Sequence, residues 1–456
     1  MSELLRVSSP PIEPIYSQTE PGQSIVLGQV KVQFDHKNTT HQEMANVTMR
    51  FVPDDRLEFV CPLETASSTF GLELFLDDNR DEKITLPDRG IAFDAFCAAV
   101  GRDHGGIVFH PKQSAVTVTS PSNVISNATF HLFNFPELVG PEDYILVTGD
   151  PPLQSFKRCG RVVLSADGWR ITVAATDQTD ELTKALKSQG GFLITHVGRI
   201  HREDGSTFSS EQLNDLLSCL QYFFSFASGR WAGVALPIGF DATGNRTFET
   251  WGMGKTADGA WNGSSSWFDE HHGELLSQVF PGFMSLWANK MWHQPLIHSL
   301  YWYLGACDLR VGIGVDSGLI LAQTALELLA WTCCVLDRKM VSPRAFKRGG
   351  LSAADKLRLL ASSLGIPKDI PSNLSALHGK KGNKWTDGME AVTGIRNSLV
   401  HPDSQEMLPN ASYVEGWELS LWYIDLVLLR LCGHQGKYAN RLSRRWRGTV
   451  ESVPWV

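Results

Sequence analysis

The stretch Gly394-Ile395-Arg396-Asn397-Ser398-Leu399-Val400-His401-Pro402 decides how the second half of this sequence is interpreted. It lies within a run whose spacing predicts a helix over residues 385–401. Pro402 disfavours α-helical backbone at the residue before it, so we expect the helix to end at His401. Asn397 and His401 are four residues apart and therefore share one face of that helix.

The residues on both sides of this stretch also have helical spacing. Apolar residues recur at intervals near 3.6, and Gly or Pro lies between most of the runs. We expect helices near 271–288, 290–304, 316–338, 352–364, 385–401 and 413–433. The run from Leu319 to Leu336 is the most apolar in the chain, but it contains Gln323 and Glu327. A carboxylate at the middle of a membrane costs roughly 2.5–3.5 kcal/mol, so we interpret this run as a buried helix of a soluble protein.

Residues 24–200 have a different pattern, which is typical of β-structure. Short alternating apolar runs are separated by Gly, Pro, Asn and Asp, and this favours a sandwich- or barrel-like sheet. The expected strands are Ser24–Phe34, Val47–Phe51, Arg56–Cys61, Phe70–Phe75, Ile107–Phe109, Ala115–Thr119, Ala128–Phe135, Tyr144–Val147, Arg161–Leu164, Trp169–Ala174 and Phe192–Ile200. In this part we expect only two short helices, at Ile91–Val100 and Asp180–Ser188.

The pattern changes at Ser209, which forms a plausible capping box with Gln212 and predicts a helix to about Ala227. Residues 229–268 are rich in Gly and Trp and are expected to be irregular.

The predicted fold class is therefore α+β, with a β-rich N-terminal domain, sandwich- or barrel-like, followed by an all-α helical bundle. We divide the chain into a β-rich sensing or binding domain at 1–205, a helical and Trp/Gly-rich connecting region at 206–289, and an α-helical domain at 290–456.

Charge is distributed unevenly along the 456 residues. The net charge is −8, yet residues 290–456 carry 20 basic and 14 acidic residues, whereas the first 289 carry 21 and 35. Such asymmetry indicates different partners for the two parts. The eight cysteines include no Cys-x-x-Cys pair, which argues against structural zinc. The N-terminus lacks the features of a secretory signal, so we expect a cytoplasmic protein.

An Arg and a His at the end of one helix suit the cleavage of RNA without a metal ion. His401 follows Arg396 after four intervening residues, a spacing that is found nowhere else in the chain. The His can act as a general base on the ribose 2′-hydroxyl or as a general acid on the leaving oxygen. The Arg can hold the phosphate and its growing charge, and Asn397 can orient either group. On an ideal helix Arg396 and His401 lie about 140° apart, so two copies facing each other across a dimer axis make a better site than one.

The motif Arg-Asn-x-x-x-His near the end of a helix, inside a helical domain, resembles the HEPN domain of ribonucleases in toxin–antitoxin and anti-phage systems. The run 323–330, QTALELLA, resembles the acidic helix of that fold, and the helix expected at 413–433 follows the motif as the fold requires. The ending Val450-Glu451-Ser452-Val453-Pro454-Trp455 resembles ApeA-like HEPN proteins of bacterial abortive infection. Those proteins place a β-rich domain before the HEPN domain.

This resemblance implies that Arg396 and His401 are catalytic, with Asn397 as a polar helper and Glu327 as a supporting acid. It implies a homodimer that cleaves RNA without a metal or other cofactor and without a membrane, with tRNA the first substrate to map. The β-rich domain would then bind a phage-derived trigger. In the basic clusters at 380–384 and 430–447 we expect these residues to contact RNA: Lys380, Lys381, Lys384, Arg441, Arg444 and Arg445.

Two other interpretations stay open. The first is a non-catalytic HEPN module that binds nucleic acid or a protein through its basic clusters. The second is a metal-dependent enzyme built around His271, His272 and Glu274. Adjacent helical residues point about 100° apart and do not all converge on one ion, which argues against the second.

Overall fold

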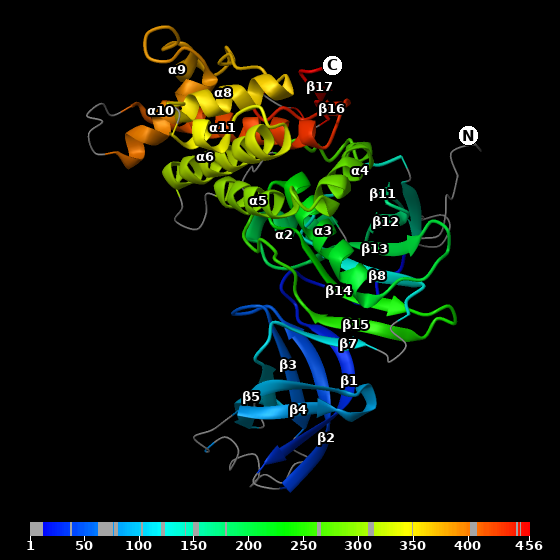
Figure 1. Ribbon diagram of the computed structural model, residues 1–456. Helices are drawn as coiled ribbons and strands as arrows, with labels where there is room; N and C mark the ends of the chain where they lie inside the picture. Colours follow the sequence, from blue (N-terminus) through cyan, green and yellow to red (C-terminus); the bar gives the residue numbers. More distant parts are fainter. Residues whose placement is uncertain are drawn as a thin grey trace, which may run out of the picture.

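The fold comes from a computed structural model, which describes residues 12–456 apart from 37–38, 63–75, 77–80, 102–103, 120–123, 142, 149–154, 178–179, 262–265, 309–313, 349, 402–407, 444–445 and 447. A β-barrel lies at one end of the molecule, an antiparallel sheet in the middle and a helical region at the other end (Figure 1). This arrangement confirms the predicted α+β class, with the β-rich part first and the helices last.

Six antiparallel strands close the barrel in the order β1-β2-β3-β6-β5-β4. Their bounds are β1 Ile25–His36, β2 Thr39–Arg50, β3 Arg56–Pro62, β4 Asp81–Leu86, β5 Ile91–Gly101 and β6 Gly106–Pro111. Alternate side chains point inward, as the two-residue period of a strand requires. Phe59 and Phe109, opposite each other on β3 and β6, are fully buried in the barrel interior.

The helix expected at Ile91–Val100 is wrong, because this segment is strand β5. Phe93, Ala95 and Cys97 are buried at every second position, while the residues between them are exposed. A short apolar run is compatible with a helix or a strand, and here the two-residue period of the buried side chains identifies the strand. The strand expected at Phe70–Phe75 lies outside the described residues.

The middle part is a seven-stranded antiparallel sheet in the order β11-β12-β13-β8-β14-β15-β7. The bounds are β7 Ala115–Thr119, β8 Asn127–Phe133, β11 Arg161–Ala166, β12 Trp169–Ala175, β13 Ile194–Arg202, β14 Gly233–Phe240 and β15 Arg246–Gly252, and a separate pair is formed by β9 Tyr144–Thr148 and β10 Ser155–Cys159. Residues such as Ile238 and Trp251 pack against the barrel, with the Trp251 and Phe59 rings 6.1 Å apart. The core on the other side is shared with helix α3 and the helical region.

Residues 229–268 are not irregular throughout, because 233–252 contain strands β14 and β15. Glycine serves close packing here: a Cβ added at Gly239 would lie 3.0 Å from side-chain atoms of Ile125 and Phe248. Both strands belong to the same sheet as β8, although they follow residue 205. The domain boundaries at 205 and 289 stay predictions.

The other predicted helices are present to within a few residues, and two short helices, at Pro343–Arg348 and Ser375–His378, were not predicted. Their bounds are α2 Asp180–Gln189, α3 Ser210–Ser228, α4 Glu274–Ala288, α5 His293–Cys307, α6 Val315–Trp331, α7 Pro343–Arg348, α8 Ala353–Leu364, α9 Ser375–His378, α10 Gly388–Val400 and α11 Asn410–Leu431. The capping box of Ser209 and Gln212 at the start of α3 is confirmed. Helix α6 continues as a π-helical segment, Thr332–Asp337, and two short strands follow α11, β16 Lys437–Tyr438 and β17 Glu451–Ser452.

Helix α6 and its π-helical extension form the core of the helical region. By length and composition alone Val315–Asp337 could cross a membrane, but 61% of its most apolar window is buried in the structure. Helices α5, α8, α10 and α11 all pack against α6. Gln323 is 1% exposed. The segment is therefore enclosed by other helices, as the sequence predicts for a buried helix.

A buried histidine ties the N-terminal segment to the central sheet. His131 Nε2 accepts hydrogen bonds from the backbone N–H groups of Ile15 (3.2 Å) and Tyr16 (3.1 Å). Its Nδ1 lies 3.2 Å from the Leu236 carbonyl oxygen and donates to it. Because Nε2 accepts, the ring must be neutral. Burial lowers the pKa of His131 to about 4.

We expect the free energy of unfolding to fall as the pH drops from about 6.5 to 4. In this window the unfolded state binds a proton at His131 that the folded state does not, so acid favours unfolding. At about 1.4 kcal/mol per pKa unit, this group accounts for a loss of about 3 kcal/mol at pH 4. Urea unfolding of wild type and His131→Asn at pH 4 to 7.5 measures the difference. The same pH dependence in both proteins would contradict the assignment.

Candidate active site

Helix α10 carries the predicted catalytic motif and is fixed at both ends. Asp387 caps its N-terminus, and its side chain accepts a hydrogen bond from the Glu390 N–H at 2.9 Å. The C-cap is His401, whose N–H donates to the Asn397 carbonyl at 3.0 Å. The predicted end of the helix at His401 is confirmed, and the side chain of this residue is exposed.

Arg358 on α8 anchors the start of α10. Its Nε donates to Asp387 Oδ2 at 2.6 Å, and its Nη2 lies 3.2 Å from Glu390 Oε2. Arg358 was not among the predicted site residues. Its partner Asp387 lies 29 positions further along the chain, a separation at which no local pattern links two charges.

Close packing between helices sets which face of α10 points inward. A Cβ added at Gly394 would lie 2.9 Å from the indole Nε1 of Trp385. Ile395 is fully buried against α11, where Gly416 leaves room for its side chain. Arg396, next along the helix, is only half-buried.

Arg396 and Asn397 contact each other directly. Arg396 Nη1 donates to Asn397 Oδ1 at 3.3 Å. Arg396 Nε is buried and has no hydrogen-bond partner within the part of the chain that the structure describes. A buried donor without a partner costs about 1–3 kcal/mol. The last turns of α10 thus carry Arg396 in contact with Asn397 and end at His401, and the guanidinium keeps one buried donor that no described residue accepts.

Glu327 lies on α6, which packs against α10. Gln323 Nε2 donates to Glu327 Oε1 at 2.8 Å, so the two residues one turn apart form a pair. Gln323 Oε1 is buried and has no partner among the described residues. The predicted supporting acid is therefore half-buried and linked to a neighbour on its own helix.

The lysines predicted to contact RNA lie between α9 and α10. Lys381 forms an ion pair with Asp369 at 2.8 Å. Lys384 Nζ lies 5.8 Å from the ring centroid of Trp385. Lys380 is half-buried. Arg444 and Arg445 lie outside the described residues.

The structure contradicts the RNA-binding assignment of Arg441. Its Nε lies 2.7 Å from Asp425 Oδ2, and the two side chains are only 4% and 1% exposed. Arg441 Nη2 also donates to the Tyr303 hydroxyl at 2.8 Å, and that hydroxyl donates to Asp425 Oδ1 at 2.8 Å. A guanidinium enclosed in this way cannot reach a phosphate, so Arg441 is a core residue.

The alternative metal site near His272 also loses support. His272 Nδ1 lies 2.8 Å from Glu274 Oε1, and Nε2 lies 3.1 Å from the Gly448 carbonyl oxygen. Burial alone would lower the pKa of His272, but these two hydrogen bonds outweigh it and raise the pKa. Both partners are acceptors, so in this arrangement each ring nitrogen donates a hydrogen and neither offers a lone pair to a metal. Within the described ranges, no group of three or more His, Cys, Asp or Glu side chains could hold a metal ion.

Comparison with known proteins gives two domain matches. Residues 120–261 match the YopA central domain, and residues 289–452 match the YopA C-terminal domain. The first region spans most of the seven-stranded sheet with α3, and the second spans α5 to β17.

One similar protein is the SPbeta prophage-derived uncharacterized protein YopA of Bacillus subtilis (strain 168). It is 28% identical over 345 residues, which cover 74% of each chain. No solved structure matches at a significant level.

Proposed function

We propose that this chain, a distant homologue of the prophage-derived YopA with regions similar to the YopA central and C-terminal domains, is an anti-phage HEPN ribonuclease. The observation that supports the proposal is the end of α10, where Arg396 contacts Asn397 and the exposed His401 follows as the C-cap. The helical region cleaves RNA as a homodimer in the cytoplasm, without a metal ion or a membrane. The prophage origin in the relative's name connects this type of sequence with phage biology.

The chemistry follows from the side chains at the end of α10. The exposed His401 accepts the proton of a ribose 2′-hydroxyl, and the oxygen attacks the adjacent phosphorus. The bond to the 5′-oxygen breaks, and an acid protonates that oxygen. The products are a 2′,3′-cyclic phosphate and a 5′-hydroxyl. Arg396 has a donor, Nη2, that makes no hydrogen bond to another described residue, and it can stabilise the charge on the phosphate.

A second copy of α10 supplies the missing acid. On one helix Arg396 and His401 point about 140° apart, which leaves a single site incomplete. When two copies face each other, one His acts as the base and the other as the acid, and both guanidinium groups surround the phosphate. Glu327 supports the site from α6, which packs against α10.

The β-rich part is the sensing half of the proposed defence protein. The first 289 residues carry 35 acidic and 21 basic residues, a charge that repels RNA and leaves this half for a different partner. We assign to it the recognition of a phage-derived trigger. The barrel is far from the helical region, with the sheet between them, so the sheet must transmit any signal (Figure 1).

The proposal is tested by expressing wild type and His401→Ala in a bacterial host, with and without phage challenge. Growth and total RNA integrity are measured in each case. We expect wild type to slow growth and fragment RNA in at least one condition, and His401→Ala to do neither. Identical behaviour of the two proteins in every condition would contradict the nuclease function.

The alternative is a non-catalytic HEPN module that binds nucleic acid or a protein. The observation that favours it is the Gln323–Glu327 pair, in which the predicted acid is occupied by a neighbour. Such a module would bind RNA equally well with His401→Ala, and wild type would leave RNA intact.

A further inference from the structure

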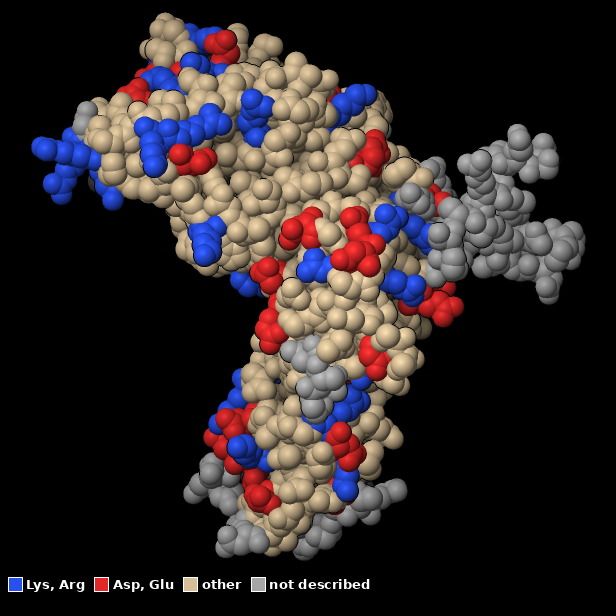
Figure 2. All heavy atoms as spheres, turned by 45° about the vertical axis from the view of Figure 1, so that its right-hand side comes forward, with Lys and Arg blue, Asp and Glu red and all other residues tan. Residues whose placement is uncertain are grey.

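The segment after α6 presents five basic side chains to solvent. Arg338 and Lys339 follow the π-helical segment directly, and three more lie on or beside α7. All five are exposed: Arg338, Lys339, Arg344, Lys347 and Arg348. Figure 2 shows that Lys and Arg side chains gather on the helical region. We call this segment, residues 338–348, the α7 basic surface.

None of these five side chains forms an ion pair with Asp or Glu in the described part of the chain. Three other cations among the described residues of the helical region do form ion pairs: Arg358, Lys381 and Arg441. Lys381 forms an ion pair with Asp369, and the buried Arg441 forms one with Asp425. The nearest acid in sequence, Asp337, accepts a hydrogen bond from the Trp292 indole at 3.3 Å. The α7 basic surface therefore keeps a positive charge that its neighbours do not cancel.

Aromatic packing and one hydrogen bond hold part of this surface in place. Phe346 on α7 is 5% exposed, and its ring meets Trp331 at 5.4 Å in an edge-to-face contact. Lys347 Nζ lies 4.6 Å from the Trp331 ring centroid. Arg338 donates to the Ser363 carbonyl at the end of α8. Because Lys347 and Arg338 are held in place before any ligand arrives, these two side chains lose less conformational entropy on binding.

The backbone conformation of Lys339, within the α7 basic surface, is also unusual. Its backbone has φ 51°, in the left-handed region that favours Gly or Asn. For a lysine this conformation costs about 1–2 kcal/mol. The chain thus places a cation where glycine would be more stable.

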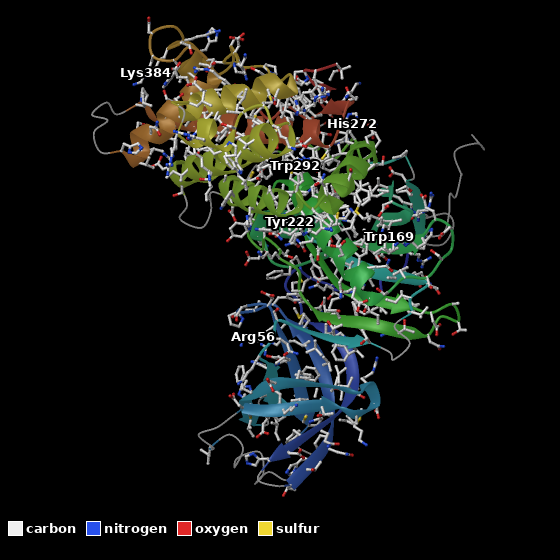
Figure 3. All side chains as sticks on the ribbon, viewed as in Figure 1. Arg56, Trp169, Tyr222, His272, Trp292 and Lys384 are labelled. Carbon is white, nitrogen blue, oxygen red and sulfur yellow. The ribbon has the colours of Figure 1, made fainter. Side chains whose placement is uncertain are left out.

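We propose that the α7 basic surface binds the phosphate backbone of RNA. This inference rests on the proposed function for the identity of the polyanion, and it locates a docking site away from the catalytic helix. Trp292, beside this surface, lies near the middle of the molecule, whereas Lys384 lies toward the outer end of the helical region (Figure 3).

The side chains present favour a nucleic-acid backbone over a membrane or a protein surface, and the proposed function specifies RNA. A membrane-binding helix needs an apolar face, but α7 has only six residues and its one aromatic side chain points inward. A protein interface needs an apolar centre, and only Leu336 and Met340 are exposed apolar residues here. Trp331 is covered by a lysine rather than open for base stacking. Binding should therefore be insensitive to sequence and steeply dependent on salt.

The test measures RNA binding by fluorescence anisotropy over a salt series, in a His401→Ala background that prevents cleavage. The probe is a labelled single-stranded RNA of about 20 nucleotides. The variant is Arg344→Gln/Lys347→Gln/Arg348→Gln. With about 0.7 counterions released per phosphate, we expect its salt slope to fall by about 2 and its affinity to fall about tenfold or more. The charge-preserving variant Arg344→Lys/Lys347→Arg/Arg348→Lys should bind like its parent.

A matched triple variant, Lys380→Gln/Lys381→Gln/Lys384→Gln, removes the same charge from the other basic cluster and should lose less affinity. The proposal is overturned if this second triple loses more, or if the first triple binds RNA like its parent. It is also overturned if the α7 basic surface is needed for vesicles containing phosphatidylglycerol and not for RNA. Binding that depends on 338–348 while wild type never cleaves RNA would support this proposal and refute the nuclease function. If the first triple does not fold, Lys339→Gln/Arg344→Gln tests two cations that make no ring contact.

Discussion

Replacing His401 or Arg396 with alanine lowers the rate of RNA cleavage by about 10²–10⁴-fold. A side chain that transfers a proton in the transition state typically contributes a factor of this size. Loss of the guanidinium removes the charge that stabilises the phosphate, with a cost of a similar order. The rate is measured in single-turnover reactions on purified protein with its trigger present. Both variants should fold, because His401 is exposed and Arg396 is half-buried.

Two matched substitutions control for the loss of any His or Arg from the helical region. His378 is exposed at the end of α9, and Arg430 is half-buried in the last turn of α11. His378→Ala and Arg430→Ala should cleave within about threefold of wild type, since neither residue lies on α10. If Arg396→Ala cuts as fast as Arg430→Ala, the assignment of the active site to α10 is wrong.

Replacing Arg441 with methionine lowers the free energy of unfolding of the helical region by about 3–5 kcal/mol. The substitution leaves Asp425 buried and without its cation, although Tyr303 still donates to it. The cost is the desolvation of an uncompensated charge rather than the value of the ion pair itself. Denaturant unfolding followed by far-ultraviolet circular dichroism at 222 nm measures the change.

The double variant Arg441→Met/Asp425→Leu distinguishes this cause from lost packing. Removing both charges together should recover at least half of the loss, because no buried charge is left unpaired. Arg430→Met, on an arginine that is not buried, should cost less than about 1 kcal/mol. A loss in the double variant equal to or larger than that of Arg441→Met alone would show that the charge is not the cause.

The helical half of the fold follows closely from the sequence. Apolar residues there recur at helical spacing over long runs, and local signals such as the Ser209 cap and the proline after His401 mark the ends. The β-rich half was harder to predict. Ile91–Gly101 is short enough to be a helix or a strand. The glycines within β14 and β15 made these two strands of the central sheet look like irregular structure in the sequence.

For the candidate site, the sequence predicts the positions of residues on one helix but not which charges are paired. The spacing of Arg396, Asn397 and His401 lies within one helix, so the sequence predicts their placement directly. Which charges are neutralised depends on contacts between distant segments. Arg441 belongs to a basic run in the sequence, yet the fold brings it onto Asp425 in the core. Arg344, in the basic run 338–348, is exposed and forms no ion pair with an acidic residue of the described part of the chain.

The chemistry of the RNA ends tests the central claim most directly. Purified wild type and its trigger are incubated with total tRNA in the presence and in the absence of EDTA, and the fragment ends are mapped in both reactions. A site of Arg396 and His401 that uses no metal predicts cleavage with 2′,3′-cyclic phosphate and 5′-hydroxyl ends, absent in His401→Ala. Intact RNA would contradict the account, as would fragments with 3′-hydroxyl and 5′-phosphate ends whose formation stops when EDTA is added.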